Sequence, residues 1–326
     1  MADLKVNYMG LELESPLILG SSTMPKTMDN VKAAADAGAG AVVLKSLFEE
    51  ELRKQDGGYG DDFHPEAYEY MQSEAAVVYG AKEYLDNIKD AKKASSMPVI
   101  ASVNCLGGKW WSDFASNIEG AGADALELNI SFVPFDVNEN PRDVEQRYVD
   151  VIKEVKSRIK IPVAVKIGQN FSSIPWTAKQ IENAGADALV MFNRYYQMGI
   201  DTRTLDLRPM HFYSSEEETF KVLRWVAALS PQLDIDISAS TGVHTSDAFI
   251  QQIIAGAKTV QVVSAVYQKG FKTISDILEG VSGWLATRQK TLDEVRGTAG
   301  KKNSREHMTF ERIQYMKVAD ARYIGE

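Results

Sequence analysis

The sequence predicts an α/β fold of the (β/α)8 barrel class, the TIM barrel. Four segments pass from a helix-like stretch through Ala-Gly-Ala into a short apolar strand, at 37–45, 121–129, 184–193 and 255–263. Glycine at the end of a helix adopts the left-handed capping conformation, and a continuous apolar strand is typically buried on both faces. The repeated helix-to-strand unit therefore indicates a parallel sheet that is covered by helices.

Eight apolar segments are predicted to be strands, and eight parallel strands close a barrel. Segments of helical period lie between them, for example 27–38, 144–159 and 245–256. An open doubly wound sheet is the alternative, but no Gly-x-Gly-x-x-Gly follows the first strand, where a dinucleotide-binding fold would carry it. The predicted strands are 16–22, 41–46, 98–104, 125–131, 162–168, 188–193, 234–240 and 259–265.

Three segments fall outside the eight repeats. Residues 3–15 alternate polar and apolar side chains around Met9-Gly10, which predicts a hairpin that closes the amino-terminal end of the barrel. Residues 47–97 and 194–215 enlarge the second and sixth strand-to-helix loops, and such loops lie over the carboxyl ends of the strands. We expect residues 1–326 to form one domain, with 288–326 as a charged C-terminal tail.

Length and charge narrow the class of protein. The 326 residues, with 44% hydrophobic and 25% charged side chains, suit one barrel. A net charge of −9 argues against binding to nucleic acid or to an anionic membrane. No long apolar run and no leader pattern occur, so we expect a cytoplasmic protein. The single Cys105 excludes a disulfide within the chain and a four-cysteine iron–sulfur cluster, and the scattered histidines form no metal motif.

Polar side chains stand where most of the predicted strands end, and the carboxyl ends of barrel strands meet at one rim. Lysines in a barrel mouth are costly unless they are paired, so Lys45 and Lys166 indicate a bound anion or an electron-rich heterocycle. Pairing of these lysines with neighbouring carboxylates is the alternative. The strand-end set is Ser21, Ser22, Lys45, Ser46, Asn104, Asn129, Ser131, Lys166, Asn193, Ser240, Thr241, Gly242 and Ser264.

The seventh and eighth connections have the composition of a phosphate site. Ser-Thr-Gly-Val at 240–243 precedes a helix that begins near Thr245, and Val-Ser-Ala at 263–265 follows the last strand. Free backbone N–H groups, a helix N-terminus and a hydroxyl are the groups that hold phosphate in many barrels. Either loop alone would be more typical of an ordinary turn, so the prediction rests on the pair.

Together these motifs resemble the dihydroorotate dehydrogenase family, which consists of FMN-dependent (β/α)8 barrels that oxidise dihydroorotate to orotate. The resemblance covers residues 3 to about 285, including the opening hairpin. The motifs that carry it are VLKS at 43–46, ELNIS at 127–131, AVKIG at 164–168, STGVHTSDAF at 240–249 and GAKTVQVVSA at 256–265. Their order along the chain matches the family.

The resemblance implies roles for most of the strand-end residues. Lys166 would lie at the pyrimidine side of the flavin, where a cation stabilises the anion formed by hydride uptake. Asn104, Asn129 and Asn193 would donate hydrogen bonds to flavin or substrate, although a strand-end cap is the alternative for each. The FMN phosphate would lie on Gly242, Val243 and Ser264, and Thr241 and Val263 would also belong to the cofactor site. Ser21, Ser22 and Ser46 would line the ring, and Lys45 would hold flavin and substrate.

The resemblance breaks at the position of the general base. The family has Cys or Ser three residues after the Asn of its ELNxS motif, and this chain has Phe132. A phenyl ring cannot accept a proton, so the family's base-assisted reaction cannot run unchanged there. Other groups could supply an acid or base, and each has a structural role as the simpler reading. These candidates are Cys105, Tyr195, Tyr196, His64 and His211, with His244 expected at a helix start.

The expected function is FMN-dependent oxidation of a CH–CH group. Because Phe132 replaces the family's base, we expect the substrate to differ from dihydroorotate. The alternatives are a Schiff-base lyase or aldolase that uses Lys166 as nucleophile, and a non-catalytic flavin- or phosphate-binding barrel. The expected partners are a small-molecule substrate and either a soluble electron acceptor or a separate redox protein. The family resemblance also implies a homodimer.

Overall fold

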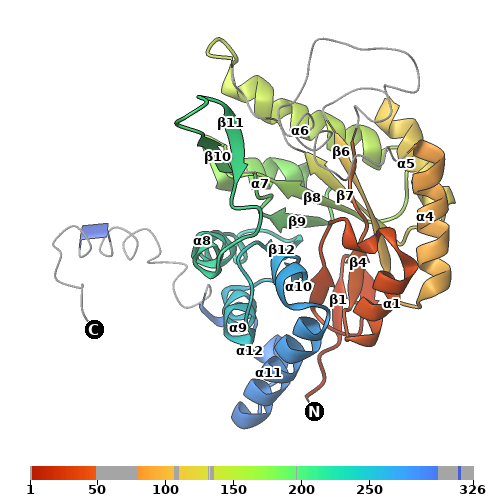
Figure 1. The fold of residues 1–326 in the computed structure, drawn as a ribbon, viewed down its shortest axis with the longest axis vertical. Coiled ribbons are helices and arrows are strands. Elements are labelled where there is room, and N and C mark those ends of the chain that lie inside the picture. The colour runs from red at the N-terminus through yellow and green to blue at the C-terminus, as the bar shows by residue number, and fades with distance from the viewer. Residues whose placement is uncertain are drawn as a thin grey trace.

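Eight parallel strands form a closed barrel in the computed structural model, which describes residues 2–48, 80–105, 110–130, 132, 136–195, 197–299 and 315–316. The strands are β3 (Leu17–Leu19), β4 (Ala41–Val43), β6 (Val99–Cys105), β7 (Ala125–Ile130), β8 (Val163–Ile167), β9 (Ala188–Met191), β12 (Asp236–Ser240) and β13 (Thr259–Val262). They pair in the order β4-β3-β13-β12-β9-β8-β7-β6, and pairing of β4 with β6 closes the ring (Figure 1). The (β/α)8 prediction is confirmed, and the doubly wound alternative is wrong.

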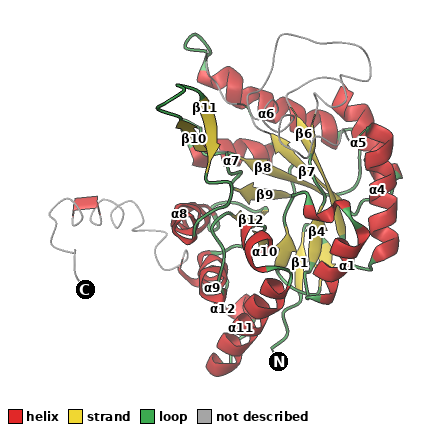
Figure 2. Cartoon of the chain, in the orientation of Figure 1, coloured by secondary structure: helices red, strands yellow, loops and turns green. Residues whose placement is uncertain are grey.

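Helices surround the barrel strands (Figure 2). The four Ala-Gly-Ala glycines, at 38, 122, 185 and 256, all have φ between 96° and 126°, which confirms their predicted role at helix ends. The helices are α1 (Met28–Asp36), α4 (Ala81–Ala94), α5 (Trp110–Gly120), α6 (Pro141–Lys156), α7 (Ile174–Asn183), α8 (Thr219–Leu229), α9 (Ser246–Ala255), α10 (Ser264–Lys269), α11 (Lys272–Arg288) and α12 (Leu292–Val295), with 3-10 turns η1 (Met24–Lys26) and η2 (Glu216–Glu218).

The predicted N-terminal hairpin is present and closes one end of the barrel. Strands β1 (Val6–Tyr8) and β2 (Leu11–Leu13) pair in an antiparallel ladder across Met9 and Gly10, which both have positive φ. The hairpin's apolar side chains pack on inward-facing barrel residues, including Ile18, Val43, Ile100, Ala164 and Val190. The alternation in residues 3–15 therefore reflects burial against the interior of the barrel.

The second and sixth strand-to-helix connections, which were predicted to be enlarged, both contain short strands. In the sixth, the predicted long loop contains a hairpin of β10 (Gln197–Ile200) and β11 (Leu207–Met210). The second contains β5 (Leu47–Phe48), which pairs with β6, and then helix α4, while residues 49–79 lie outside the described part of the chain. Most of the predicted tail, residues 300–314 and 317–326, also lies outside it.

The eighth strand ends earlier than expected. It was predicted over 259–265, but β13 stops at Val262 and α10 begins at Ser264. The reason is that Val266 and Tyr267 both donate their backbone N–H to the carbonyl of Val263, which starts the helix. No helix in the described ranges is long and apolar enough to cross a membrane.

Candidate active site

A cavity of about 200 Å³ opens at the carboxyl ends of β3, β8, β9, β12 and β13, and we call it the main cavity. Its position is the one that barrel enzymes use for their active sites. The walls contain both loops of the predicted phosphate site and the lysine of β8. The predicted site residues that line it are Ser21, Lys166, Asn193, Ser240, Thr241, Gly242, Val243, Val263 and Ser264, and they are joined by Phe192, Arg194, Phe212, Ser214, Gln261 and Val262.

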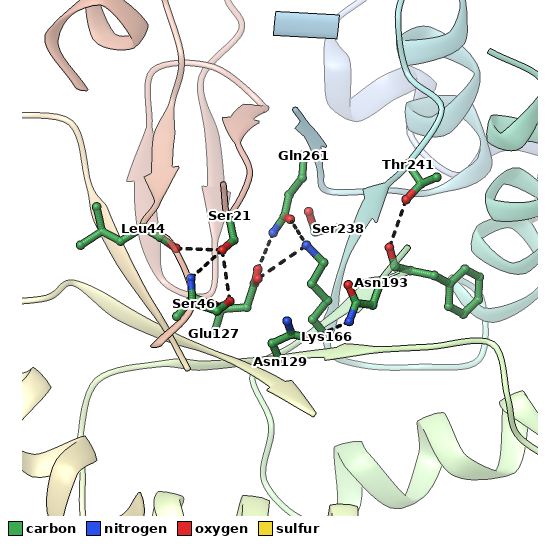
Figure 3. A network of polar contacts seen from close by, with 12 residues as sticks. Ser21, Leu44, Ser46, Glu127, Asn129, Lys166, Asn193, Ser238, Thr241 and Gln261 are labelled. Carbon is green, nitrogen blue, oxygen red and sulfur yellow. Dashed lines mark hydrogen bonds and ion pairs between the residues drawn. The ribbon is translucent and has the colours of Figure 1, made fainter. Parts of the chain in front are cut away.

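Lys166 is held at the base of the main cavity by two buried polar side chains. Its Nζ donates to Oε1 of Gln261 at 3.0 Å and lies 3.7 Å from Oε1 of Glu127 (Figure 3). Gln261 donates its Nε2 to the other Glu127 oxygen at 2.5 Å. Glu127 is only 1% exposed and Lys166 only 7%, so the three side chains form a buried network.

This network bears on the two interpretations of Lys166 drawn from the sequence, which were a bound ligand and pairing with a carboxylate. Pairing with a carboxylate, the alternative considered from the sequence, does occur, because Glu127 projects into the barrel two residues before Asn129. An ammonium group has three donors, and Lys166 also lines the cavity. Sequence reasoning missed Glu127 and Gln261, although a charged residue inside ALELN and an amide inside TVQVV were the available signals.

Two of the three predicted asparagines are in contact. Asn193 follows β9 and donates its Nδ2 to Oδ1 of Asn129 on β7 at 2.8 Å, across the end of β8. Asn104 is buried and stands beside Asn129 in the register of β6 and β7. Asn193 lines the main cavity, whereas Asn104 and Asn129 lie next to it without contributing to its wall.

The predicted serines Ser21 and Ser46 form a short chain of hydrogen bonds near the ends of β3 and β4. Ser21 donates its hydroxyl to the carbonyl of Leu44 at 2.9 Å and accepts the N–H of Ser46 at 3.0 Å. The Ser46 hydroxyl lies 2.7 Å from that of Ser102. These contacts tie the end of β3 to the segment after β4. Lys45 is buried in that segment and Ser22 is half-buried, and neither lines the main cavity.

The first predicted phosphate loop forms a tight turn at Thr241 and Gly242. Thr241 and Gly242 have φ values of 88° and 79°, and a Cβ on Gly242 would stand 2.2 Å from the backbone nitrogen of Thr219. Only glycine fits this position, and the left-handed β-branched Thr241 is a genuine outlier. Such outliers gather at functional sites, where the surrounding structure holds them in place.

Ser214 connects the two phosphate loops to the sixth connection. Its hydroxyl accepts the N–H of Gly242 at 3.3 Å and lies 3.1 Å from Nε2 of His244, and its N–H donates to the hydroxyl of Ser264 at 3.0 Å. Burial lowers the pKa of His244 from its usual value. Sequence reasoning missed Ser214, because a serine in a long loop carries no pattern.

Phe132 packs away from the main cavity. Its ring meets the ring of Tyr148 edge-on at 5.2 Å between centroids, and the guanidinium of Arg147 lies 4.7 Å from its centre. Both partners belong to α6, outside the barrel. The position that would carry the family's base therefore holds a ring that packs against α6.

Two of the alternative acid–base candidates in the loops, Tyr195 and His211, belong to the described part of the chain. Tyr195 packs on Gly168, where a Cβ would stand 2.6 Å from the tyrosine hydroxyl. His211 is exposed at the end of the second hairpin. Tyr196, His64, Ser131 and the side chain of Cys105 lie outside the described part of the chain. Among the described residues, no cluster of His, Cys, Asp or Glu is placed to hold a metal ion.

A second cavity of about 160 Å³ adjoins the main one, and we call it the side cavity. It lies between the segments that follow β8 and β9 and the start of α8. Asn193, Arg194 and Thr241 line both cavities. The other residues of its wall are Gln169, Asn170, Tyr195, Glu218 and Lys221.

Comparison with known proteins assigns this barrel to a family. The family model described as dihydroorotate dehydrogenase matches residues 3–285. The chain belongs to this family. The dihydroorotate dehydrogenase family is generally flavin-dependent, and its members are oxidoreductases, so this chain is a dihydroorotate dehydrogenase-like oxidoreductase. The resemblance drawn from the strand-end motifs is confirmed.

Curated relatives match over nearly their whole length. A Pyrococcus abyssi protein is 30% identical over 308 residues, covering 91% of this chain and 99% of the relative. A Methanocaldococcus jannaschii protein is 28% identical over 307 residues, covering 91% and 98%. A Thermoplasma acidophilum protein is 29% identical over 296 residues, covering 87% and 94%. All three are named dihydroorotate dehydrogenase B (NAD(+)), catalytic subunit.

Proposed function

We propose that this chain binds FMN in the main cavity and oxidises a CH–CH group of its substrate, which transfers a hydride to the flavin. The observation that carries the proposal is the continuity of one cavity from the buried Lys166 to the glycine turn at 241–243. When bound, FMN supplies the hydride acceptor. The residues fit such a ligand, because the turn excludes any side chain at 242 and Lys166 brings a cation to the other end.

The two ends of the main cavity would bind different parts of FMN. Lys166, fixed by Glu127 and Gln261, would orient the ring system and place a positive charge beside it. Val243, Val263 and Ser264 would surround the phosphate, and Ser214 would exchange its hydrogen bonds for new ones as the phosphate enters. Asn129 and Asn193, bonded to each other, would position the substrate.

The cofactor is testable without knowing the substrate. We expect heat-released cofactor to run as FMN on chromatography, because one phosphate turn and no dinucleotide fingerprint provide no site for an adenylate. Release of FAD, or purified protein that takes up no flavin, would contradict the proposal. A Schiff-base reaction is not favoured, since a nucleophilic lysine needs apolar or cationic neighbours and Lys166 stands beside the Glu127 carboxylate.

The substrate is proposed to differ from dihydroorotate. A general base within hydrogen-bonding distance contributes about 10²–10⁴-fold to rate, and Phe132 supplies none. We expect slow flavin reduction by dihydroorotate in stopped-flow measurements. Because the side chain at position 132 packs against α6, Phe132→Cys should leave that rate as low as Phe132→Ala, which removes the ring without adding a base. Wild-type reduction at roughly 1–10³ s⁻¹, the ordinary range for enzymes, would show that another residue acts as base.

Electrons are proposed to leave through a separate redox protein. The relatives are named as catalytic subunits of NAD⁺-linked enzymes, which is the support for a partner here. We further propose that the chain forms a homodimer. Light scattering on the purified protein tests the dimer, and rapid flavin reoxidation by NAD⁺ with no added protein would contradict the need for a partner.

A further inference from the structure

The side cavity contains a guanidinium group whose hydrogen bonding is incomplete. Arg194 donates its Nε to both oxygens of Glu218, at 2.9 and 3.2 Å. The same carboxylate accepts the N–H of Ser215 at 2.8 Å, which fixes its position. Nη2 of Arg194 is buried and has no hydrogen-bond partner among the described residues. A buried unsatisfied charged donor is costly, so the Arg194 guanidinium retains hydrogen-bonding capacity for a ligand.

The charge and size of the side cavity point to the kind of ligand. Arg194 and Lys221 contribute two positive charges against the one negative charge of Glu218, and the amides of Gln169 and Asn170 line the same wall. Arginine with fixed geometry is the residue that best recognises carboxylate and phosphate oxygens. A volume of about 160 Å³ leaves room for one acidic group.

Because the two cavities share Asn193, Arg194 and Thr241, a group in the side cavity lies directly beside a ligand in the main cavity. We propose that the side cavity binds the anionic end of the substrate, a carboxylate or phosphate, through Arg194 with support from Lys221. The assignment rests on the proposed flavin function, since it places the oxidised carbon of the substrate over the main cavity. The substrate class is therefore a small acid whose charged group is remote from the reacting bond.

The test uses flavin-loaded protein, so that the phosphate turn is already occupied, with inorganic phosphate and succinate as separate probes. Binding is followed through the flavin absorbance and by calorimetry. We expect one probe to bind, Arg194→Gln to weaken it at least tenfold, Arg194→Lys to restore part of the loss, and Lys221→Gln to weaken it less. Arg208→Gln, which alters an arginine that lines neither cavity, is the matched control.

Three outcomes would overturn the assignment. Neither probe binding below about 10 mM would remove the side cavity as an anion site. Loss of FMN affinity in Arg194→Gln with unchanged probe binding would show that Arg194 serves the cofactor. Equal weakening of probe binding in Arg208→Gln would show that the probe responds to the overall surface charge and not to the side cavity. If the protein takes up no flavin, the proposed function fails, yet selective loss of probe binding in Arg194→Gln by calorimetry would still support the anion site.

Discussion

The two antiparallel hairpins of this chain have similar patterns and opposite surroundings. In β1–β2, Tyr8 and Leu13 are each 1% exposed and face the interior of the barrel. In β10–β11, the cross-strand pair Ile200 and Leu207 is 56% and 62% exposed. The first hairpin closes the amino-terminal end, and the second projects beyond the carboxyl ends of the strands (Figure 1). The sequence predicted the closing role of the first hairpin, whereas the second hairpin lies in a segment that was predicted only as an enlarged loop.

The difference separates stability from function in this barrel. The closed end buries apolar side chains, so its residues contribute free energy of folding. The open end buries charged groups such as Lys166 and Glu127, which cost free energy to desolvate and are retained where they serve a ligand. Substitutions at the two ends should therefore change different measurements.

The largest effect is expected at the closed end. Leu13→Ala should lower the free energy of unfolding by about 2–5 kcal/mol, because it opens a cavity in a packed core. Leu207→Ala in the second hairpin is the matched control and should change it by less than about 0.5 kcal/mol. Urea unfolding measures both. Equal losses in the two variants would break the comparison.

The next effect concerns the open end. Lys166→Met should weaken FMN binding about 10–100-fold, as expected for loss of a charged hydrogen bond of about 1.5–3 kcal/mol, and lower the flavin reduction potential. This variant leaves the buried Glu127 carboxylate without its cationic partner. The double variant with Glu127→Gln is therefore needed as well. Titration and potentiometry measure the outcome. Full affinity and an unchanged potential in both variants would remove Lys166 from the flavin site.

A smaller effect should come from the turn of the first hairpin. The N–H of Met9 donates to Oδ2 of Asp236 at 2.8 Å, which ties the turn to β12. Asp236→Ala should cost about 1 kcal/mol of unfolding free energy, typical of one hydrogen bond. Asp201→Ala, which removes contacts only within the exposed second hairpin, should cost less. The opposite ranking would contradict a closing role for the first hairpin.

The smallest effect is a pH dependence from His244. Burial lowers its folded-state pKa below the unfolded value near 6.5, so the unfolded chain binds the proton more readily. Stability should therefore be complete above about pH 6.5 and fall as the pH drops below it. His244→Phe should flatten that slope, whereas His211→Gln, at an exposed position, should leave it unchanged. Thermal unfolding between pH 5 and 8 tests both variants.

The site was partly predictable for a physical reason. Residues that follow parallel strands must meet at one rim, so Lys166, Asn193, Thr241 and Ser264 could be grouped from strand order alone. Side-chain direction within the loops was not predictable. Phe132 turned toward α6, and Ser214 reached the phosphate turn from a loop thirty positions away in sequence from its partner His244.

The sequence by itself determined the barrel, because helix-end glycines and eight apolar strand segments follow local rules of backbone geometry and burial. It also determined the family, through motifs at strand ends. Only the tertiary structure decided that the sixth connection contains an exposed hairpin, that Glu127 and Gln261 hold Lys166, and that Arg194 stands between two cavities. Those outcomes depend on contacts between residues far apart in the chain, which local patterns do not encode.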